Sequence, residues 1–156
     1  MPYAKQHSTI LLAEDDEDDV LLMRRAFIKS RLANPLQVVR DGEEAIQYLG
    51  GEEKYADRNL YPFPLLLLLD LHLPKCDGFD VLQWMRGQPD FRPPIIVVLT
   101  SSTDQRDVEK ARELGADSYF RKPGDLEELV QLMLRVQGYW LLLDRKPERF
   151  PVMLES

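Results

Sequence analysis

The chain has 156 residues, 44% of them hydrophobic and 30% charged, which is an ordinary composition for one globular domain. The formal net charge of −7 argues against nucleic acid as a partner, because binding a phosphate backbone requires a basic surface. The single cysteine, Cys76, excludes an intramolecular disulfide and a cysteine metal cluster, and with an N-terminus unlike a signal peptide it favours a cytoplasmic location.

Short apolar runs alternate along the chain with longer amphipathic stretches, the pattern of a parallel sheet covered by helices on both faces. In chain order, strands are expected at residues 9–13, 36–39, 65–69, 95–99 and 118–120. Helices are expected at residues 18–32, 43–49, 79–85, 104–114 and from 125 onward. The sequence therefore predicts an α/β domain with a five-stranded, doubly wound parallel sheet. No run approaches the ~20 apolar residues that span a bilayer, so no membrane segment is expected.

Capping residues support the predicted helix boundaries. Asp104 and Asp125 occupy favourable N-cap positions, while Gly50 and Gly115 stand where helices end. Asp16 is expected to begin a helix rather than to bind a metal directly.

Polar residues follow four of the predicted strands, at the edge of the sheet where parallel α/β proteins bind ligands. They are Glu14, Asp15 and Asp16 after the first strand, Asp70 after the third, Thr100, Ser101 and Ser102 after the fourth, and Lys122 and Pro123 after the fifth. Carboxylates gathered at one edge repel each other unless a hard cation binds them, which predicts a Mg²⁺ site. Beside that metal Asp70 would be a nucleophile toward phosphorus, with Lys122 and Thr100 stabilising charge on the phosphoryl oxygens. The product would be an aspartyl phosphate.

Four segments, ILLAEDD, LLLLLDLHLPKCDG, IIVVLTSS and SYFRKP, resemble the signature blocks of the response-regulator receiver family, in the family's order. The resemblance covers about residues 8–137 and implies a flavodoxin-like (βα)5 receiver fold. It also implies a Mg²⁺-dependent phosphorelay in which a sensor histidine kinase transfers a phosphoryl group to Asp70. Such a protein is a switch that signals by conformational change and partner binding, and its only enzymatic activity would be self-dephosphorylation.

The resemblance also assigns roles to single residues. Glu14 and Asp15 match the acidic pair, Asp70 the phosphoacceptor, Thr100 the switch hydroxyl, Tyr119 the switch aromatic and Lys122 the invariant lysine. The backbone carbonyl of His72 would complete the metal shell, and Pro123 would follow a cis peptide bond. Phosphorylation would draw Thr100 toward the phosphoryl group and let Tyr119 turn inward. The layout is similar to that of single-domain regulators paired with phytochrome-type histidine kinases.

Each of these residues also has a simpler interpretation. Asp70 could cap the following loop, Thr100 could serve helix entry, and Lys122 could be a solvated lysine. The ring of His72 could bind a metal, although an outward-facing side chain is expected. Cys76 is expected to pack rather than to react.

Three rival functions fit the residues less well. A nucleotide- or flavin-binding protein would follow its first strand with a glycine-rich turn, whereas this chain continues with EDDEDD. A phosphatase similar to the haloacid dehalogenases would carry an aspartate at position 72, where this sequence has histidine. A degenerate receiver that only binds partners would lack some of Glu14, Asp15, Asp70, Thr100 and Lys122.

The C-terminal residues form a separate segment in this interpretation, with a receiver domain at residues 1–137 and an extension at 138–156. Leu132, Val136, Tyr139 and Leu143 recur at helical spacing and predict an apolar stripe beside the core-facing one. An uncovered stripe of this kind indicates a protein interface, so the extension is expected to be the dimerisation arm of a homodimer. The alternative is that the extension folds back over its own sheet. No output domain is expected in this sequence, so the signal would pass to a partner.

Overall fold

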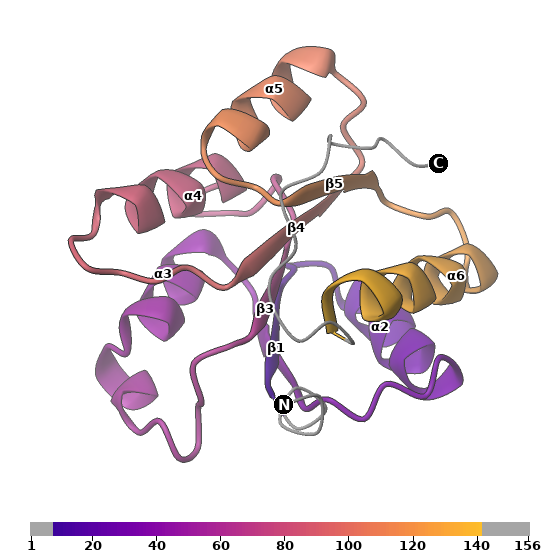
Figure 1. Cartoon of the computed structure of the whole chain (residues 1–156), viewed down its shortest axis with the longest axis horizontal. Coiled ribbons are helices and arrows are strands. Elements are labelled where there is room, and N and C mark those ends of the chain that lie inside the picture. The colour runs from indigo at the N-terminus through magenta and orange to yellow at the C-terminus, as the bar shows by residue number, and fades with distance from the viewer. Residues whose placement is uncertain (1–7, 142–156) are drawn as a thin grey trace.

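A computed structural model describes residues 8–141, which form one parallel sheet covered by helices on both faces (Figure 1). The strands are β1 (Ile10–Ala13), β2 (Leu36–Val39), β3 (Leu66–Leu69), β4 (Ile95–Thr100) and β5 (Ser118–Arg121). They are all parallel, in the order β2-β1-β3-β4-β5. The helices are α2 (Glu17–Lys29), α3 (Gly42–Gly50), α4 (Gly78–Gly87), α5 (Gln105–Glu113) and α6 (Leu126–Val136). A 3₁₀ turn η1 (Glu53–Ala56) follows α3, and a π-helical turn η2 (Gln137–Leu141) continues α6.

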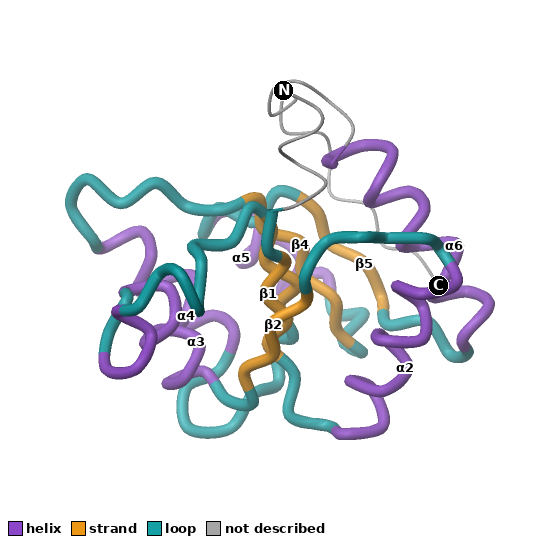
Figure 2. Tube along the Cα trace, turned by 90° about the horizontal axis from the view of Figure 1, so that it is seen from below, coloured by secondary structure: helices purple, strands orange, loops and turns teal. Residues whose placement is uncertain are grey.

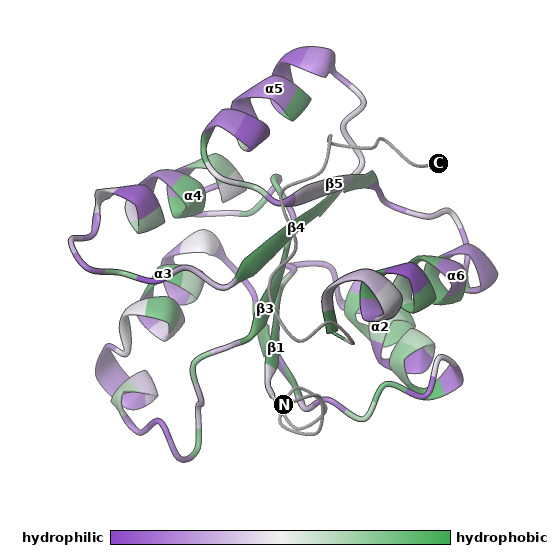
Figure 3. Ribbon diagram, viewed as in Figure 1, coloured by the Kyte–Doolittle hydropathy of each residue, from purple (hydrophilic) through white to green (hydrophobic). Residues whose placement is uncertain are grey.

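The central strands β3 and β4 are apolar up to Thr100 at the end of β4, because both of their faces are covered (Figure 3). Leu67 and Leu69 of β3 pack with α3, α4 and α5, whereas Leu66 and Leu68 pack on the other face with α2 and α6. Figure 2 shows α3 and α4 on the opposite side of the sheet from α2 and α6. Burying one such leucine contributes roughly 1.5–3 kcal/mol. The predicted doubly wound fold is confirmed.

The strand order places a ligand-binding position between β1 and β3. The chain leaves β1 toward β2 on one side and then crosses to β3 on the other, so the crevice at the carboxyl ends of β1 and β3 is a topological switch point. Ala13 is paired with Leu69 at the ends of these strands. The next residues, Glu14 and Asp70, therefore emerge side by side.

Aspartate caps begin the helices as the sequence predicts. The carboxylate of Asp16 accepts hydrogen bonds from the backbone of Asp18 and Asp19, and Asp104 and Asp125 cap α5 and α6 in the same way. After α3 the left-handed residue is Gly51, with φ 64°, one position later than the sequence suggested. No helix within residues 8–141 combines the length and apolarity that crossing a membrane requires.

The end of α6 differs from the predicted pattern. Leu132 and Val136 are buried in the same core as β1 and β3, and so are Trp140 and Leu141 of η2. The prediction that Leu132 and Val136 form an uncovered stripe is wrong, because α6 packs against both the sheet and α2 and so buries two faces. Trp140 donates its indole N–H to the Ser118 hydroxyl at 3.2 Å. Leu143 of that stripe lies outside the described residues.

Candidate functional site

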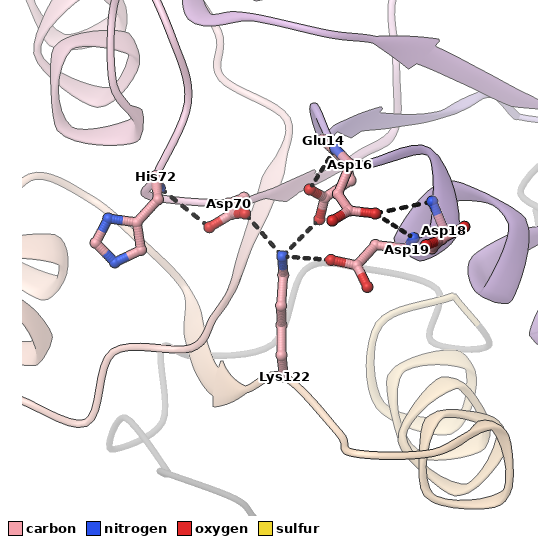
Figure 4. Close-up of polar contacts among 7 residues, drawn as sticks. All are labelled: Glu14, Asp16, Asp18, Asp19, Asp70, His72 and Lys122. Atoms are coloured by element: carbon pink, nitrogen blue, oxygen red, sulfur yellow. Dashed lines mark hydrogen bonds and ion pairs between the residues drawn. The ribbon is translucent and has the colours of Figure 1, made fainter.

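Polar residues from three of the predicted strand ends, Glu14, Asp70 and Lys122, meet in one pocket (Figure 4). Thr100, at the end of β4, is not among the residues that line it. Glu14 follows β1 and Asp70 follows β3, and both side chains are buried. Lys122 follows β5, where its backbone N–H donates to the Thr100 carbonyl at 2.8 Å. The predicted convergence of Glu14, Asp70 and Lys122 is confirmed.

The Lys122 ammonium lies at the centre of this pocket. Its Nζ is 2.8 Å from Glu14 Oε1, 2.8 Å from Asp70 Oδ2 and 2.9 Å from Asp19 Oδ2. An ammonium has three N–H donors, so each of them has a carboxylate acceptor. The interpretation of Lys122 as a merely solvated lysine is therefore wrong.

Burial and these contacts shift the pKa values of Lys122 and Glu14. Burial alone would lower the pKa of Lys122, but the hydrogen bonds to Asp70, Glu14 and Asp19 outweigh it and hold this pKa above its usual value. Burial raises the pKa of Glu14, and the contact with Lys122 opposes that rise. The ammonium thus offsets part of the cost of burying carboxylates.

Three carboxylates are close enough to share a metal ion. One oxygen from each of Glu14, Asp15 and Asp70 lies within 4.8 Å of the other two; Asp15 is exposed, whereas Glu14 and Asp70 are buried. Asp70 Oδ1 accepts a hydrogen bond from the His72 backbone N–H at 3.0 Å, which helps to fix the carboxylate. Carboxylate oxygens at this spacing fit a hard divalent cation.

The hydroxyl of Thr100 is the polar group at the end of β4. Its Oγ1 is fully buried and has no hydrogen-bond partner within the described residues. A buried hydroxyl without a partner is costly, so such groups often have a functional reason. Thr100 can therefore form a new hydrogen bond without breaking an existing one.

Tyr119 was expected to turn inward on phosphorylation, but its side chain is already buried in this structure. Its hydroxyl donates to the Ser102 carbonyl at 3.3 Å, and burial raises its pKa. Tyr119 thereby links β5 to the segment that follows Thr100.

Two observations near the pocket bear on the expectations for the His72 side chain and for the peptide bond before Pro123. The His72 side chain is exposed, as expected, and only its backbone N–H contacts Asp70. The peptide bond between Lys122 and Pro123 is trans, so the expected cis bond is wrong; Lys122 reaches the carboxylates through its long aliphatic chain.

A glycine keeps the segment after Asp70 close to α4. A Cβ atom at Gly78 would lie 2.6 Å from the Asp70 carbonyl oxygen and 2.7 Å from Leu71 Cα, closer than real Cβ atoms approach. The Gly78 N–H donates to the Leu71 carbonyl at 2.9 Å. Only glycine therefore allows α4 to begin directly against the Asp70 backbone.

The sequence did not single out Asp19 as a member of the pocket. It belongs to the acidic run EDDEDD, and negative charges of this kind are favourable at the start of any helix, so they do not by themselves indicate a site. Its position three residues after the Asp16 N-cap, on a helix that begins at the strand ends, is the signal that could have found it.

The site consists of a pocket in which carboxylates surround one ammonium, at the switch point of a five-stranded doubly wound sheet, and of a buried hydroxyl at the end of β4. Together these features define a receiver-type α/β domain. The family model described as response regulator receiver domain matches residues 10–134, and the chain belongs to this family. It is therefore a signalling switch of the two-component type.

Similar proteins agree with this assignment. The chain is 36% identical over 138 residues to a probable methanogenesis regulatory protein, FilR2, of Methanothrix harundinacea, covering 88% of this chain and 86% of that protein. It is similar to the crystal structure of the phosphorylated cyanobacterial phytochrome response regulator RcpA, with TM-score 0.78, 35% identity, and coverage of 86% and 94% of the two chains. It is also similar to the Mn²⁺-bound form of response regulator Rcp1, with TM-score 0.77, 34% identity, and coverage of 90% and 99%.

Proposed function

We propose that Asp70 accepts a phosphoryl group from the phosphohistidine of a sensor histidine kinase. A carboxylate oxygen of Asp70 attacks phosphorus, the P–N bond to the histidine breaks, and the imidazole leaves with the electron pair. The observation that supports this role best is the position of Asp70: its buried carboxylate lies close to both Glu14 and Asp15 and 2.8 Å from the Lys122 ammonium. Asp70 does cap the following loop, since its Oδ1 accepts the His72 N–H, but this contact leaves Oδ2 to Lys122, so the loop cap does not compete with the proposed role.

We further propose Mg²⁺ as the metal, held by Glu14, Asp15, Asp70 and the backbone carbonyl of His72. When bound, Mg²⁺ would supply positive charge that lets a phosphate approach these carboxylates. The oxygen ligands support this choice, as does the Mn²⁺-bound form of the similar regulator Rcp1. The exposed ring of His72 has no part in this site.

Lys122, Thr100 and Tyr119 would convert phosphorylation into a conformational change. Lys122 donates to one phosphoryl oxygen and the Thr100 hydroxyl to another. Thr100 would then pull the segment that contains Ser102, whose carbonyl bonds the Tyr119 hydroxyl. The rearranged surface of β4, α5 and β5 would present the signal to a partner. Any enzymatic activity would be limited to hydrolysis of the protein's own aspartyl phosphate.

The partners follow from the same role. A phytochrome-type histidine kinase is supported by the similarity to the cyanobacterial phytochrome response regulator. The net charge of −7 supports a protein partner rather than nucleic acid. A cytoplasmic location suits the single thiol of Cys76.

We propose that the protein forms a homodimer through α6 and residues 138–156. Two apolar side chains that are exposed on α6 and η2 support this assembly: Leu134 is 44% exposed and Tyr139 is 37% exposed.

Labelling with a small acyl phosphate in the presence of Mg²⁺ tests the assignment of Asp70. The parent protein should gain one phosphoryl group, detected by intact mass, and Asp70→Asn should gain none. Asp18→Asn is the control, because Asp18 is exposed and its carboxylate has no contact with Lys122 among the described residues. Chelating the metal should stop labelling of the parent. Labelling of Asp70→Asn at the parent rate would show that another residue is the acceptor.

A further inference from the structure

The three carboxylates around Lys122 differ in one respect. Glu14 and Asp70 also belong to the group that could hold a metal ion, whereas Asp19 does not. Asp19 comes from the first turn of α2 and its side chain is 38% exposed, compared with 5% for each of the other two. Asp19 is therefore the one acceptor of Lys122 that a metal would leave in place.

Metal binding changes what the Lys122 ammonium can contact. A cation that binds Glu14 and Asp70 competes with Lys122 for their oxygens, and the Lys122 side chain is only 22% exposed. A half-buried ammonium that loses its acceptors is unfavourable because water replaces them incompletely. The contact with Asp19 prevents that loss.

We propose that Asp19 is a positioning residue that gives Lys122 an acceptor outside the metal ligands. With this contact, Glu14 and Asp70 can bind the metal and Asp70 can receive the phosphoryl group while Lys122 stays paired and close to Asp70. The inference builds on the proposed function of Asp70 and its metal site. It assigns a role to the contact between Lys122 Nζ and Asp19 Oδ2, which links α2 to the end of β5 (Figure 4).

The inference predicts an effect on Mg²⁺ binding in the absence of any phosphodonor. Without Asp19 the metal-free protein loses one of three acceptors of Lys122, but the metal-bound protein loses the only one that remains. Titration calorimetry with Mg²⁺ alone should therefore give a higher Kd, and so weaker Mg²⁺ binding, for Asp19→Ala than for the parent. We expect a factor of about fivefold, which corresponds to the ~1 kcal/mol of a partly exposed ion pair.

Asp18→Ala is the matched control, since it removes the same charge from the same helical turn and Asp18 is exposed. Asp19→Ala should weaken Mg²⁺ binding about fivefold more than Asp18→Ala does. Asp19→Glu, which keeps the carboxylate, should restore most of the affinity. In a Lys122→Ala background, Asp19→Ala and Asp18→Ala should have equal effects, because the residue through which Asp19 acts is gone. Thermal melts of each variant would establish that it is folded.

Two results would overturn the inference. Equal Mg²⁺ affinities for Asp19→Ala and Asp18→Ala would mean that only net charge matters. A difference that persists in the Lys122→Ala background would mean that Asp19 does not act through Lys122. Because these titrations need no phosphodonor, their outcome is independent of whether Asp70 is the residue that is labelled.

Discussion

At the scale of single residues, the pocket works because one ammonium compensates several carboxylates. Glu14 and Asp70 are both buried; burial, and to a lesser extent the charge of Asp70, raises the pKa of Glu14. Lys122 donates to both and so offsets part of their repulsion. The proposed metal and phosphoryl group would bind to side chains that already lie in place.

A variant of Thr100 can separate phosphorylation of Asp70 from the conformational change that we expect to follow it. We expect Thr100→Val to accept the phosphoryl group on Asp70 but to show a much smaller change around Tyr119, measured by NMR chemical shifts of its ring. Because the buried hydroxyl has no partner to lose, the free energy of unfolding should change by less than ~1 kcal/mol.

Thr100→Ser, which keeps the hydroxyl, is the control and should respond to phosphorylation like the parent. An undiminished response of the Tyr119 ring in Thr100→Val would disprove the coupling.

The residues of this pocket were predictable to different degrees. Glu14, Asp70 and Lys122 could be placed together because parallel strands bring their carboxyl ends to one edge. Asp19 is separated from Lys122 by 103 positions, and its contact depends on how α2 leaves β1. Strand order alone does not specify that angle, so the sequence did not place Asp19 in the pocket.

At the scale of elements, the segment between α3 and β3 is more ordered than its sequence suggested. The polar residues 51–64 predict a loop, but Tyr55 and Tyr61 of this segment pack their rings against each other and against Tyr48 of α3. Arg58 donates to the carbonyls of Tyr48 and Leu49 and so satisfies the end of α3. The residues of this segment that make the contacts lie mostly outside helices and strands. They therefore leave no periodic pattern in the sequence from which the contacts could be predicted.

The phenol of Tyr48 makes the stability of this segment depend on pH. Its hydroxyl donates to the Pro62 carbonyl at 2.8 Å, and burial raises its pKa from 10.0 to about 12. Since the folded pKa is the higher one, the stabilisation is complete below the unfolded value of 10.0 and is lost as the pH rises toward 12. Tyr48→Phe should therefore lower the free energy of unfolding by ~1 kcal/mol near neutral pH.

Urea unfolding of the parent and of Tyr48→Phe at several pH values measures this effect. The difference in stability should shrink above pH 10.0, because the variant has no phenol to ionise at this position. The other tyrosines ionise in both proteins, so their contributions cancel. A difference that stays constant up to the alkaline end would contradict the raised pKa.

At the scale of the whole molecule, the helical end of the described chain belongs to the domain core. The sequence predicted two apolar stripes on the last helix and left one uncovered. In the structure the π-helical turn η2 continues α6 beyond Gln137 and carries Trp140 to the Ser118 hydroxyl of β5. An α-helical period cannot anticipate a π turn, because the wider turn shifts every later side chain around the axis. Trp140 and Leu141 therefore pack into the core of their own domain, while residues 142–156 of the extension lie outside the described residues.

Because Trp140 and Leu141 belong to the core, a truncation that tests the proposed dimer should end after these residues. Truncation after Gln137 would remove Trp140 and Leu141 from the core and would confuse assembly with folding. Truncation after Leu141 removes only residues 142–156 and keeps that core. If those residues and the exposed face of α6 hold two copies together, the truncated protein should be a monomer that is still labelled on Asp70. Light scattering at micromolar concentration measures the mass of both proteins.

Leu134→Glu in the full chain is the companion variant, because Leu134 is 44% exposed and tolerates a charge without loss of the core. It too should shift the protein toward monomer, whereas a full-length parent that is already monomeric would contradict the dimer and leave the switch untouched.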